Sequence, residues 1–124
     1  MEIQFTDREL DIMTVLWDRG PSTVAEVRDA LSDDLAYTTV LTLLRVLEEK
    51  GHVTHTEEGR AHRFRPLVER DEAGTSALRR LKDRLFSGSP ELLLTRLVDD
   101  ATLSVDDLER LRDLLERRLD EEAP

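Results

Sequence analysis

The spacing of hydrophobic residues changes at Gly51, and this change restricts the fold more than any other feature. Before that glycine, apolar residues recur every three or four positions in three successive segments, which predicts three amphipathic helices. After it, the runs HVTHT and AHRFR flank EEGR, and two β-branched or aromatic runs around a glycine predict a β-hairpin. Three helices and then a hairpin, within residues 1–66, is the order of a helix-turn-helix with an appended wing.

Local signals support these elements. The motifs TDRE and TVAE each place a threonine three residues before a glutamate, which is the spacing of a capping box at the start of a helix. The third helix is expected at residues 36–50, where Gly51 follows as a C-terminal stop. The hairpin is expected at residues 52–65, and Pro66 closes its second strand.

Leucines dominate the helices expected after Pro66, in SGSPELLLTRLV and SVDDLERLRDLLERRLDEEAP. One small lobe can hardly bury so many leucines within itself, whereas a two-fold dimer buries them; a self-contained monomeric bundle stays open as the alternative. The predicted fold is therefore mainly α, with a winged helix-turn-helix (three helices plus the hairpin wing) at residues 1–68 and a helical dimerisation lobe at residues 69–124. The residues expected at the dimer contact are Leu78, Leu81, Leu85, Phe86, Leu93, Leu97, Leu111 and Leu115.

Composition excludes several kinds of protein. The 124 residues include no cysteine, so disulfides and thiolate metal sites are excluded. No window is long and apolar enough to span a membrane, and the first residues lack the profile of a signal peptide, so we expect a cytoplasmic protein. The net charge of −10 argues in general against a nucleic-acid partner. Any positive potential that function needs must therefore be local.

Enzymatic and metal-binding readings have little support. The chain has no nucleophile elbow, P-loop, dinucleotide-binding fingerprint or zinc-protease motif, so we expect no enzyme and no cofactor. The three histidines, His52, His55 and His62, lack the carboxylate or thiolate ligands that complete a tetrahedral site. Polar strand residues are the favoured interpretation of these histidines, and no metal is expected.

The predicted third helix has a polar face that suits the DNA major groove. On a helical wheel Thr38, Thr42 and Arg45 lie opposite the apolar stripe, and Thr39 lies at its flank. Small side chains allow close approach, threonine can contact base edges or phosphates, and arginine can bind guanine. A merely solvated polar face is the alternative.

Positive charge concentrates in the predicted wing, where GRAHRFR supplies Arg60, Arg63 and Arg65. Alternation along a strand places Arg63 and Arg65 on the face opposite His62 and Phe64. Such arginines can reach phosphates or the minor groove; the alternative is that they pair with the neighbouring glutamates, Glu57 and Glu58. The predicted DNA contacts are Thr38, Thr39, Thr42 and Arg45 in the third helix, Arg60 and Arg63 in the wing, and Ser22 and Thr23 at the start of the second helix.

Four stretches give the chain a family likeness: TDRELDIMTVLWDRGPSTVAEV, YTTVLTLLRVLEEKG, EGRAHRFRP, and LFSGSPELLLTRL followed by LSVDDLERLRDLLE. In this order and at these distances the sequence resembles the penicillinase-repressor (BlaI/MecI) family of winged-helix transcriptional repressors. The resemblance implies a homodimeric repressor on a palindromic DNA operator that controls a β-lactam-resistance or stress operon.

The resemblance also implies a means of induction, because a membrane sensor triggers proteolysis of some family members near the dimer lobe. The best-known members carry Asn-Phe at the cleavage point, where this chain has Arg96-Leu97. The copper-responsive branch carries C-terminal cysteines, which this chain lacks. The competing hypothesis is a winged-helix module that binds a basic protein through its acidic surface and does not bind DNA.

Overall fold

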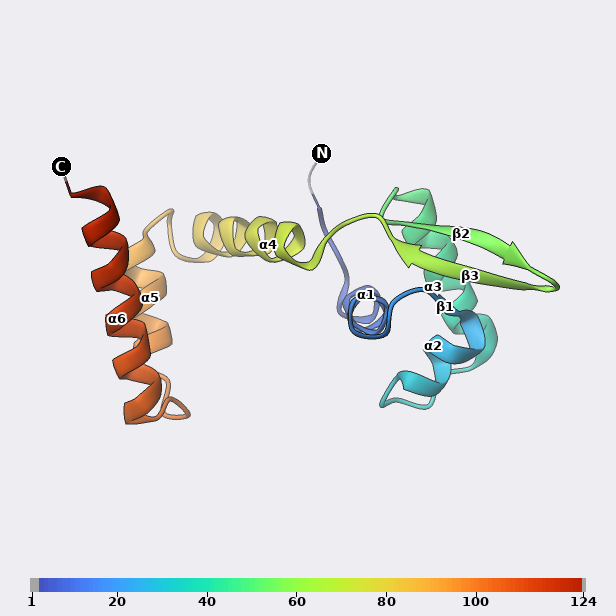
Figure 1. Ribbon diagram of the computed structural model, residues 1–124, viewed down its shortest axis with the longest axis horizontal. Helices are drawn as coiled ribbons and strands as arrows, with labels where there is room; N and C mark the ends of the chain where they lie inside the picture. Colours follow the sequence, from blue (N-terminus) through green and yellow to red (C-terminus); the bar gives the residue numbers. More distant parts are fainter. Residues whose placement is uncertain (1–2, 124) are drawn as a thin grey trace. The chain divides into compact units, whose positions relative to one another are not determined.

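A computed structural model describes residues 3–123, and its elements follow the predicted order (Figure 1). The elements are α1 (Asp7–Arg19), β1 (Ser22–Thr23), α2 (Val24–Ala30), α3 (Tyr37–Glu49), β2 (Val53–Glu58), β3 (Ala61–Pro66), α4 (Arg70–Leu85), α5 (Pro90–Val98) and α6 (Val105–Glu122). The chain divides into two compact units, which meet along the sequence at Leu78 and Arg79.

The first unit is a winged helix built around one apolar core. Helices α1, α2 and α3 surround that core, and the β2–β3 hairpin extends beyond them as the wing (Figure 1). Burial of the apolar stripes of all three helices and of one face of the sheet holds the helices together. The fully enclosed core residues are Ile12, Met13, Leu16, Val24, Val27, Val40, Leu44, Leu47, Val53 and Phe64.

The small sheet is antiparallel with the strand order β1-β3-β2. His55 lies opposite Phe64 in the hairpin, and Ser22 of β1 lies opposite the same phenylalanine on its other side. The hairpin bends at Gly59, whose φ of 62° is in the left-handed region that glycine adopts without strain. The strand β1 was not predicted, because two residues are too few for any alternation of polar and apolar side chains.

The predicted starts of the first two helices are confirmed, and two later helices begin with similar caps. Thr6, Thr23 and Ser104 each accept a hydrogen bond from the backbone N–H three residues on, and an acidic side chain at that third position completes each capping box. Ser89 caps α5, where Pro90 occupies the first turn. The order of the elements therefore follows from signals within a few residues of each helix start.

The first turns of α4 pack against α1, within the unit that ends at Leu78. Trp17 of α1 donates a hydrogen bond from Nε1 to the carbonyl oxygen of Val68 at 2.9 Å. The Arg70 guanidinium pairs with Asp18 and lies 5.5 Å from the centroid of the Trp17 ring. Ala73 is buried. These contacts bind the start of α4 to α1.

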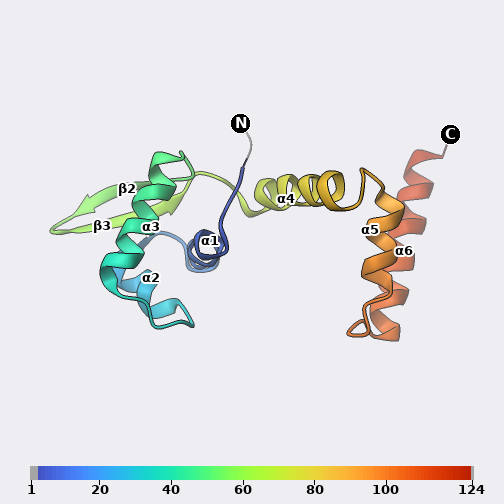
Figure 2. The ribbon, with the colours of Figure 1, turned by 180° about the vertical axis from the view of Figure 1, so that it is seen from behind.

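The second unit contains the end of α4 with α5 and α6, and the last two run side by side (Figures 1 and 2). No residue from 79 to 123 is buried, although each helix carries several leucines. Leu85 is 68% exposed and Leu119 is 70% exposed. The apolar side chains of this unit are thus left largely in contact with solvent within one chain.

Candidate nucleic-acid interface

Helix α3 presents the predicted polar face to solvent. Its inner face buries Val40, Leu44 and Leu47 in the core. The side chains of Thr38, Thr39, Thr42 and Arg45 are all exposed. A short hydroxyl-bearing surface beside one arginine therefore extends along the outer side of α3, with nothing from residues 3–123 covering it.

The start of α3 differs from the starts of the other capped helices. Ala36 occupies its N-cap and offers no side-chain hydrogen bond, and the first turn carries no acidic residue. Further along, the Thr42 hydroxyl donates to the carbonyl oxygen of Thr38 at 2.9 Å, which leaves the lone pairs of its oxygen free to accept. The positive end of the helix dipole here meets no protein carboxylate on α3 itself, which is favourable for a phosphate.

The arginines of the wing fall into two groups. Arg60 and Arg65 are exposed, and no carboxylate in residues 3–123 lies at ion-pair distance from either. Arg63, in contrast, is 30% exposed and pairs with both Glu26 and Glu58. The alternative of pairing with a neighbouring glutamate is therefore realised for Arg63, through Glu58. Arg65 was recognised as part of the basic run but was not among the predicted contacts.

The two predicted contacts at the start of α2 have structural roles. Ser22 is 1% exposed, and its hydroxyl donates to the carbonyl oxygen of Gly20 at 2.9 Å. The Thr23 hydroxyl accepts the backbone N–H of Glu26 at 3.2 Å as the N-cap of α2. The Ser22 hydroxyl is therefore enclosed, whereas Thr23 is half-buried and stays a predicted phosphate contact that also caps α2.

Ion pairing sorts the basic residues of the first unit by position. Within residues 3–78, six lysines and arginines are paired with carboxylates: Arg8, Arg19, Arg28, Lys50, Arg63 and Arg70. The remaining three are Arg45, Arg60 and Arg65, and all of them lie in α3 or the wing. The available positive charge of this acidic unit is therefore confined to the helix and the hairpin that were predicted to contact DNA.

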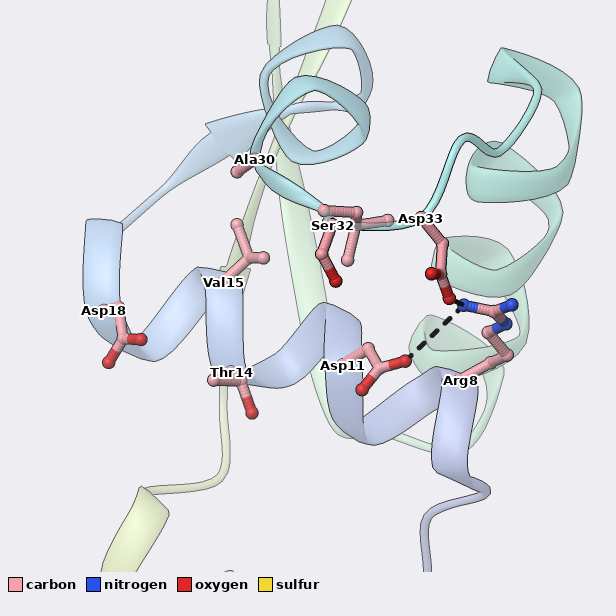
Figure 3. Close-up of a pocket in the computed structure, with 9 residues that line it drawn as sticks. Arg8, Asp11, Thr14, Val15, Asp18, Ala30, Ser32 and Asp33 are labelled. Carbon is pink, nitrogen blue, oxygen red and sulfur yellow. Dashed lines mark hydrogen bonds and ion pairs between the residues drawn. The ribbon is translucent and has the colours of Figure 1, made fainter.

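The hollow between α1 and the connection from α2 to α3 has the opposite character (Figure 3). It encloses about 270 Å³, and Asp11, Asp18 and Asp33 contribute to its lining. The side chain of Arg8 points toward Asp33 and Asp11 and pairs with both (Figure 3). A surface with three carboxylates and one neutralised arginine repels phosphate. The acidic excess of the first unit is thus partly located away from α3.

Two stacked histidines, His55 and His62, join the wing to α3. The rings of His55 and His62 stack with centroids 4.4 Å apart, and His55 Nδ1 lies 2.6 Å from the Glu48 carboxylate of α3. No group of three or more potential metal ligands is arranged to hold an ion within residues 3–123. The cluster therefore ties β2 to the last turn of the candidate recognition helix through an imidazole–carboxylate hydrogen bond.

The C-terminal end of α3 is tied to α1 through a buried carboxylate. Both oxygens of Glu9, which is 2% exposed, accept hydrogen bonds from Lys50 Nζ, at 2.9 and 2.8 Å. Burial alone raises the pKa of Glu9, but the hydrogen bonds from Lys50 and from the Thr6 backbone outweigh it and leave that pKa below its usual value. An ionised Glu9 thereby ties the C-terminal end of α3 to α1.

Comparison with known sequences identifies the family. Residues 5–117 match the family described as Penicillinase repressor. The chain belongs to this family. The "Transcriptional regulator BlaI" of Mycobacterium tuberculosis is 41% identical over 113 residues, which cover 86% of this chain and 78% of that protein. The penicillinase repressor of Bacillus licheniformis is 25% identical over 115 residues and covers 91% of this chain and 90% of that protein. The family is one of transcriptional repressors and not of enzymes.

Solved structures agree with this assignment. The DNA-binding domain of the repressor BlaI superposes with a TM-score of 0.52 at 30% identity, over 58% of this chain and 90% of that one. A monomeric form of BlaI from Bacillus licheniformis, solved with the blaP half-operator, superposes with a TM-score of 0.50 at 28% identity over the same shares. A MarR-family protein from Bacillus stearothermophilus, with a TM-score of 0.54 and 18% identity, shares the fold over 96% of this chain and 76% of its own.

Two further observations concern the remaining predictions. Among residues 3–123, no helix combines the length and the apolar composition needed to cross a lipid bilayer. The bond between Arg96 and Leu97 lies inside α5, where Leu97 is 46% exposed. Helical backbone has to unwind locally before a protease can bind it in an extended form.

Proposed function

We propose that this chain is a transcriptional repressor that binds a palindromic DNA operator as a homodimer. The observation that carries the proposal is the position of the unpaired arginines: in residues 3–78 they occur only in α3 and the wing. A relative that was solved with a half-operator supports the same role for the winged helix.

In the proposed complex α3 enters the major groove. Thr38 and Thr39 meet base edges and phosphates, Thr42 accepts from a base-edge donor, and Arg45 donates to a base or to a flanking phosphate. The wing follows the backbone beside the groove, where Arg60 and Arg65 contact phosphates. With few cations and a net charge of −10, the protein binds random DNA weakly, because sequence-independent affinity comes from phosphate contacts by lysine and arginine.

The homodimer is proposed to form through the second unit. Leucines at 43% to 68% exposure occupy consecutive turns of α4, and none of residues 79–123 is buried in one chain. A second copy supplies a matching surface by symmetry and spaces two recognition helices for two half-sites. The predicted contacts keep their place in this proposal: Leu78, Leu81, Leu85, Leu97 and Leu115 are exposed, whereas Phe86, Leu93 and Leu111 are half-buried.

The regulated genes are proposed from the relatives. The methicillin resistance regulatory protein MecI of Staphylococcus aureus is 20% identical over 93% of this chain, and a penicillinase repressor is also among the relatives. We therefore assign this chain to a β-lactam-resistance or stress operon. Induction is proposed to involve a sensor-triggered protease acting near Arg96-Leu97 after α5 unwinds.

The experiment that tests DNA binding is selection of duplexes from a random pool by the full chain, followed by affinity measurement on the enriched sequence. The expected result is an enriched palindrome. Replacing Thr42 and Arg45 together by alanine should weaken binding to it by about tenfold or more, since each lost base contact costs about 1–3 kcal/mol. Undiminished binding by this double variant contradicts the role of α3.

A matched control replaces Arg28 by alanine. Arg28 lies in α2, pairs with Asp29 and lies 6.0 Å from the Tyr37 ring centroid. The substitution therefore removes one positive charge and leaves the proposed groove contacts in place. We expect a smaller loss of affinity that does not depend on DNA sequence. If no duplex is enriched even at low salt, the chain is instead a winged-helix module for protein partners.

A further inference from the structure

Arg63 is the most heavily engaged side chain of the wing. Its Nε donates to Glu58 of β2 at 2.5 Å, and its Nη1 donates to Glu26 of α2 at 2.9 Å and to the carbonyl oxygen of Pro21 at 3.1 Å. Its backbone lies opposite Thr23 of β1. A single guanidinium thus connects both strands of the wing to the start of α2.

The Glu26 carboxylate of this network is held in its ionised form. Hydrogen bonds from the backbone and hydroxyl of Thr23 lower the pKa of Glu26, and the charge of Arg63 lowers it further. The hydrogen bond to Glu58 is the main reason why the pKa of Arg63 is raised. The Glu26 carboxylate and the Arg63 guanidinium are therefore both charged in the neutral range. The planar fork of arginine suits two carboxylates at once.

Without Arg63, little else supports this face of the wing. The strand β1 contains only two residues, so the backbone ladder that fastens β3 to the body of the domain is short. On the opposite face, the hydrogen bond between His55 and Glu48 ties β2 to α3. Each face of the hairpin therefore has one polar side-chain tie, and the tie through Arg63 reaches the helix that precedes α3.

A guanidinium paired with two carboxylates contributes little net positive charge at the surface. A DNA phosphate would have to compete with Glu26 and Glu58 for it. Arg60 lies at the bend of the hairpin, and Arg65 lies two residues after Arg63 on the same face of β3. Both are exposed, and neither pairs with a carboxylate in residues 3–123. These two arginines are therefore available to phosphates in a way that Arg63 is not.

We propose that Arg63 is a positioning residue for DNA binding: it holds the wing at the angle to α3 at which Arg60 and Arg65 meet phosphates, and it does not contact DNA itself. This inference rests on the DNA-binding function proposed above. It changes the role of Arg63 from a predicted phosphate contact to the support of two others.

The first test uses the sign of a charge effect, with Glu58→Gln compared with Glu57→Gln on the enriched duplex. Removing a negative charge near DNA ordinarily strengthens binding. Glu57 is exposed and its carboxylate has no partner in the described part of the chain, so Glu57→Gln should bind as well as the parent or better. Glu58→Gln should instead bind at least about threefold more weakly, because it removes the negative charge that holds the Arg63 guanidinium.

The second test compares Arg63→Lys with Arg65→Lys. Lysine keeps the charge that a phosphate attracts but lacks the fork that reaches two carboxylates. Arg65→Lys should retain most of the affinity, whereas Arg63→Lys should lose at least about threefold. In a chain that already carries Arg60→Ala and Arg65→Ala, the loss caused by Arg63→Lys should fall to less than about twofold, because the contacts that it positions are gone.

Three results overturn the positioning role: tighter binding by Glu58→Gln, full affinity of Arg63→Lys, or a loss by Arg63→Lys that stays the same in the doubly substituted background. The last result makes Arg63 a direct phosphate contact. Circular dichroism and melting temperature confirm that each variant is folded. If the parent protein enriches no duplex, both the DNA-binding function and the positioning role of Arg63 are wrong. The three results above contradict only the positioning role.

Discussion

At the scale of single residues, two titratable groups near the end of α3, Glu9 and His52, make the stability of the fold depend on pH. Burial lowers the pKa of His52 below its ordinary 6.5, and the charge of Lys50 lowers it further, while Glu9 opposes this in part. His52 is 4% exposed, and its ring lies 4.9 Å from that of Phe5. The folded protein therefore favours the neutral form of His52 and the ionised form of Glu9.

The sign of the pH dependence follows directly. Both pKa values are lower in the folded chain than in the unfolded chain, so the unfolded chain binds more protons and stability falls on acidification. We expect the free energy of unfolding to decline below about pH 6.5 through His52 and further below about pH 4.5 through Glu9. Urea unfolding at a series of pH values measures both steps.

Replacing His52 by leucine should remove the first step and leave the second. The control, Phe5→Leu, disturbs the same ring contact without removing a titrating group, so it should lower stability at every pH and keep the parent's slope. Parallel curves for the parent and His52→Leu between about pH 7.5 and pH 5.5 would show that His52 does not carry the first step.

At the scale of the elements, two glycines predict opposite effects of the same substitution. Gly51 ends α3 with a φ of 83°, and a Cβ added there meets no atom within 4 Å, so alanine is disfavoured by backbone strain alone. Gly74 lies inside α4, where a Cβ likewise meets nothing. Gly51→Ala should cost about 1 kcal/mol, whereas Gly74→Ala should stabilise by up to about 1 kcal/mol.

Chemical denaturation at neutral pH measures both changes under one condition. A destabilised Gly74→Ala would mean that α4 is bent or closely approached at that position. An unchanged Gly51→Ala would mean that the chain can leave α3 by a different path, and DNA affinity would then be expected to change with it.

Local signals account for most of the elements that could be predicted. The third helix was expected at residues 36–50 and spans Tyr37–Glu49. The prediction is accurate because the apolar stripe lies within the helix itself and the glycine that stops it follows directly. Phe64 faces the core and Arg63 lies on the other face of β3, as the alternation along the strand predicts. Where the pattern repeats over several residues, burial selects one orientation and sequence reasoning succeeds.

Contacts between distant segments limited the prediction of the site. Arg63 and Glu26 lie 37 residues apart, and nothing in either neighbourhood indicates that the turn after α1 brings them together. Ser22 looked like an exposed residue at a helix start, but the pairing of β1 with β3 buries it. The availability of a charged or polar side chain depends on its neighbours in space, which spacing along the chain does not show.

At the scale of the whole molecule, the exposed leucines predict the oligomeric state. Leu85→Glu and Leu115→Glu each place a charge on the proposed dimer surface, so they should shift the mass measured by sedimentation toward the monomer and weaken binding to the palindrome. Leu10→Glu is the matched control, since Leu10 is 43% exposed but lies in α1, outside that surface. A parent protein that sediments as a monomer at micromolar concentration contradicts the dimer.

The lack of any buried residue between 79 and 123 has a consequence for how the amount of this protein is sensed. In the proposed dimer these helices acquire a core only when two chains meet, so the order of this part of the chain depends on the number of copies in the cell. Newly made chains at low abundance would present loosely packed α5 and α6, with Arg96-Leu97 open to proteolysis, whereas abundant chains would protect one another. Occupancy of the operator would then rise more steeply than the protein level.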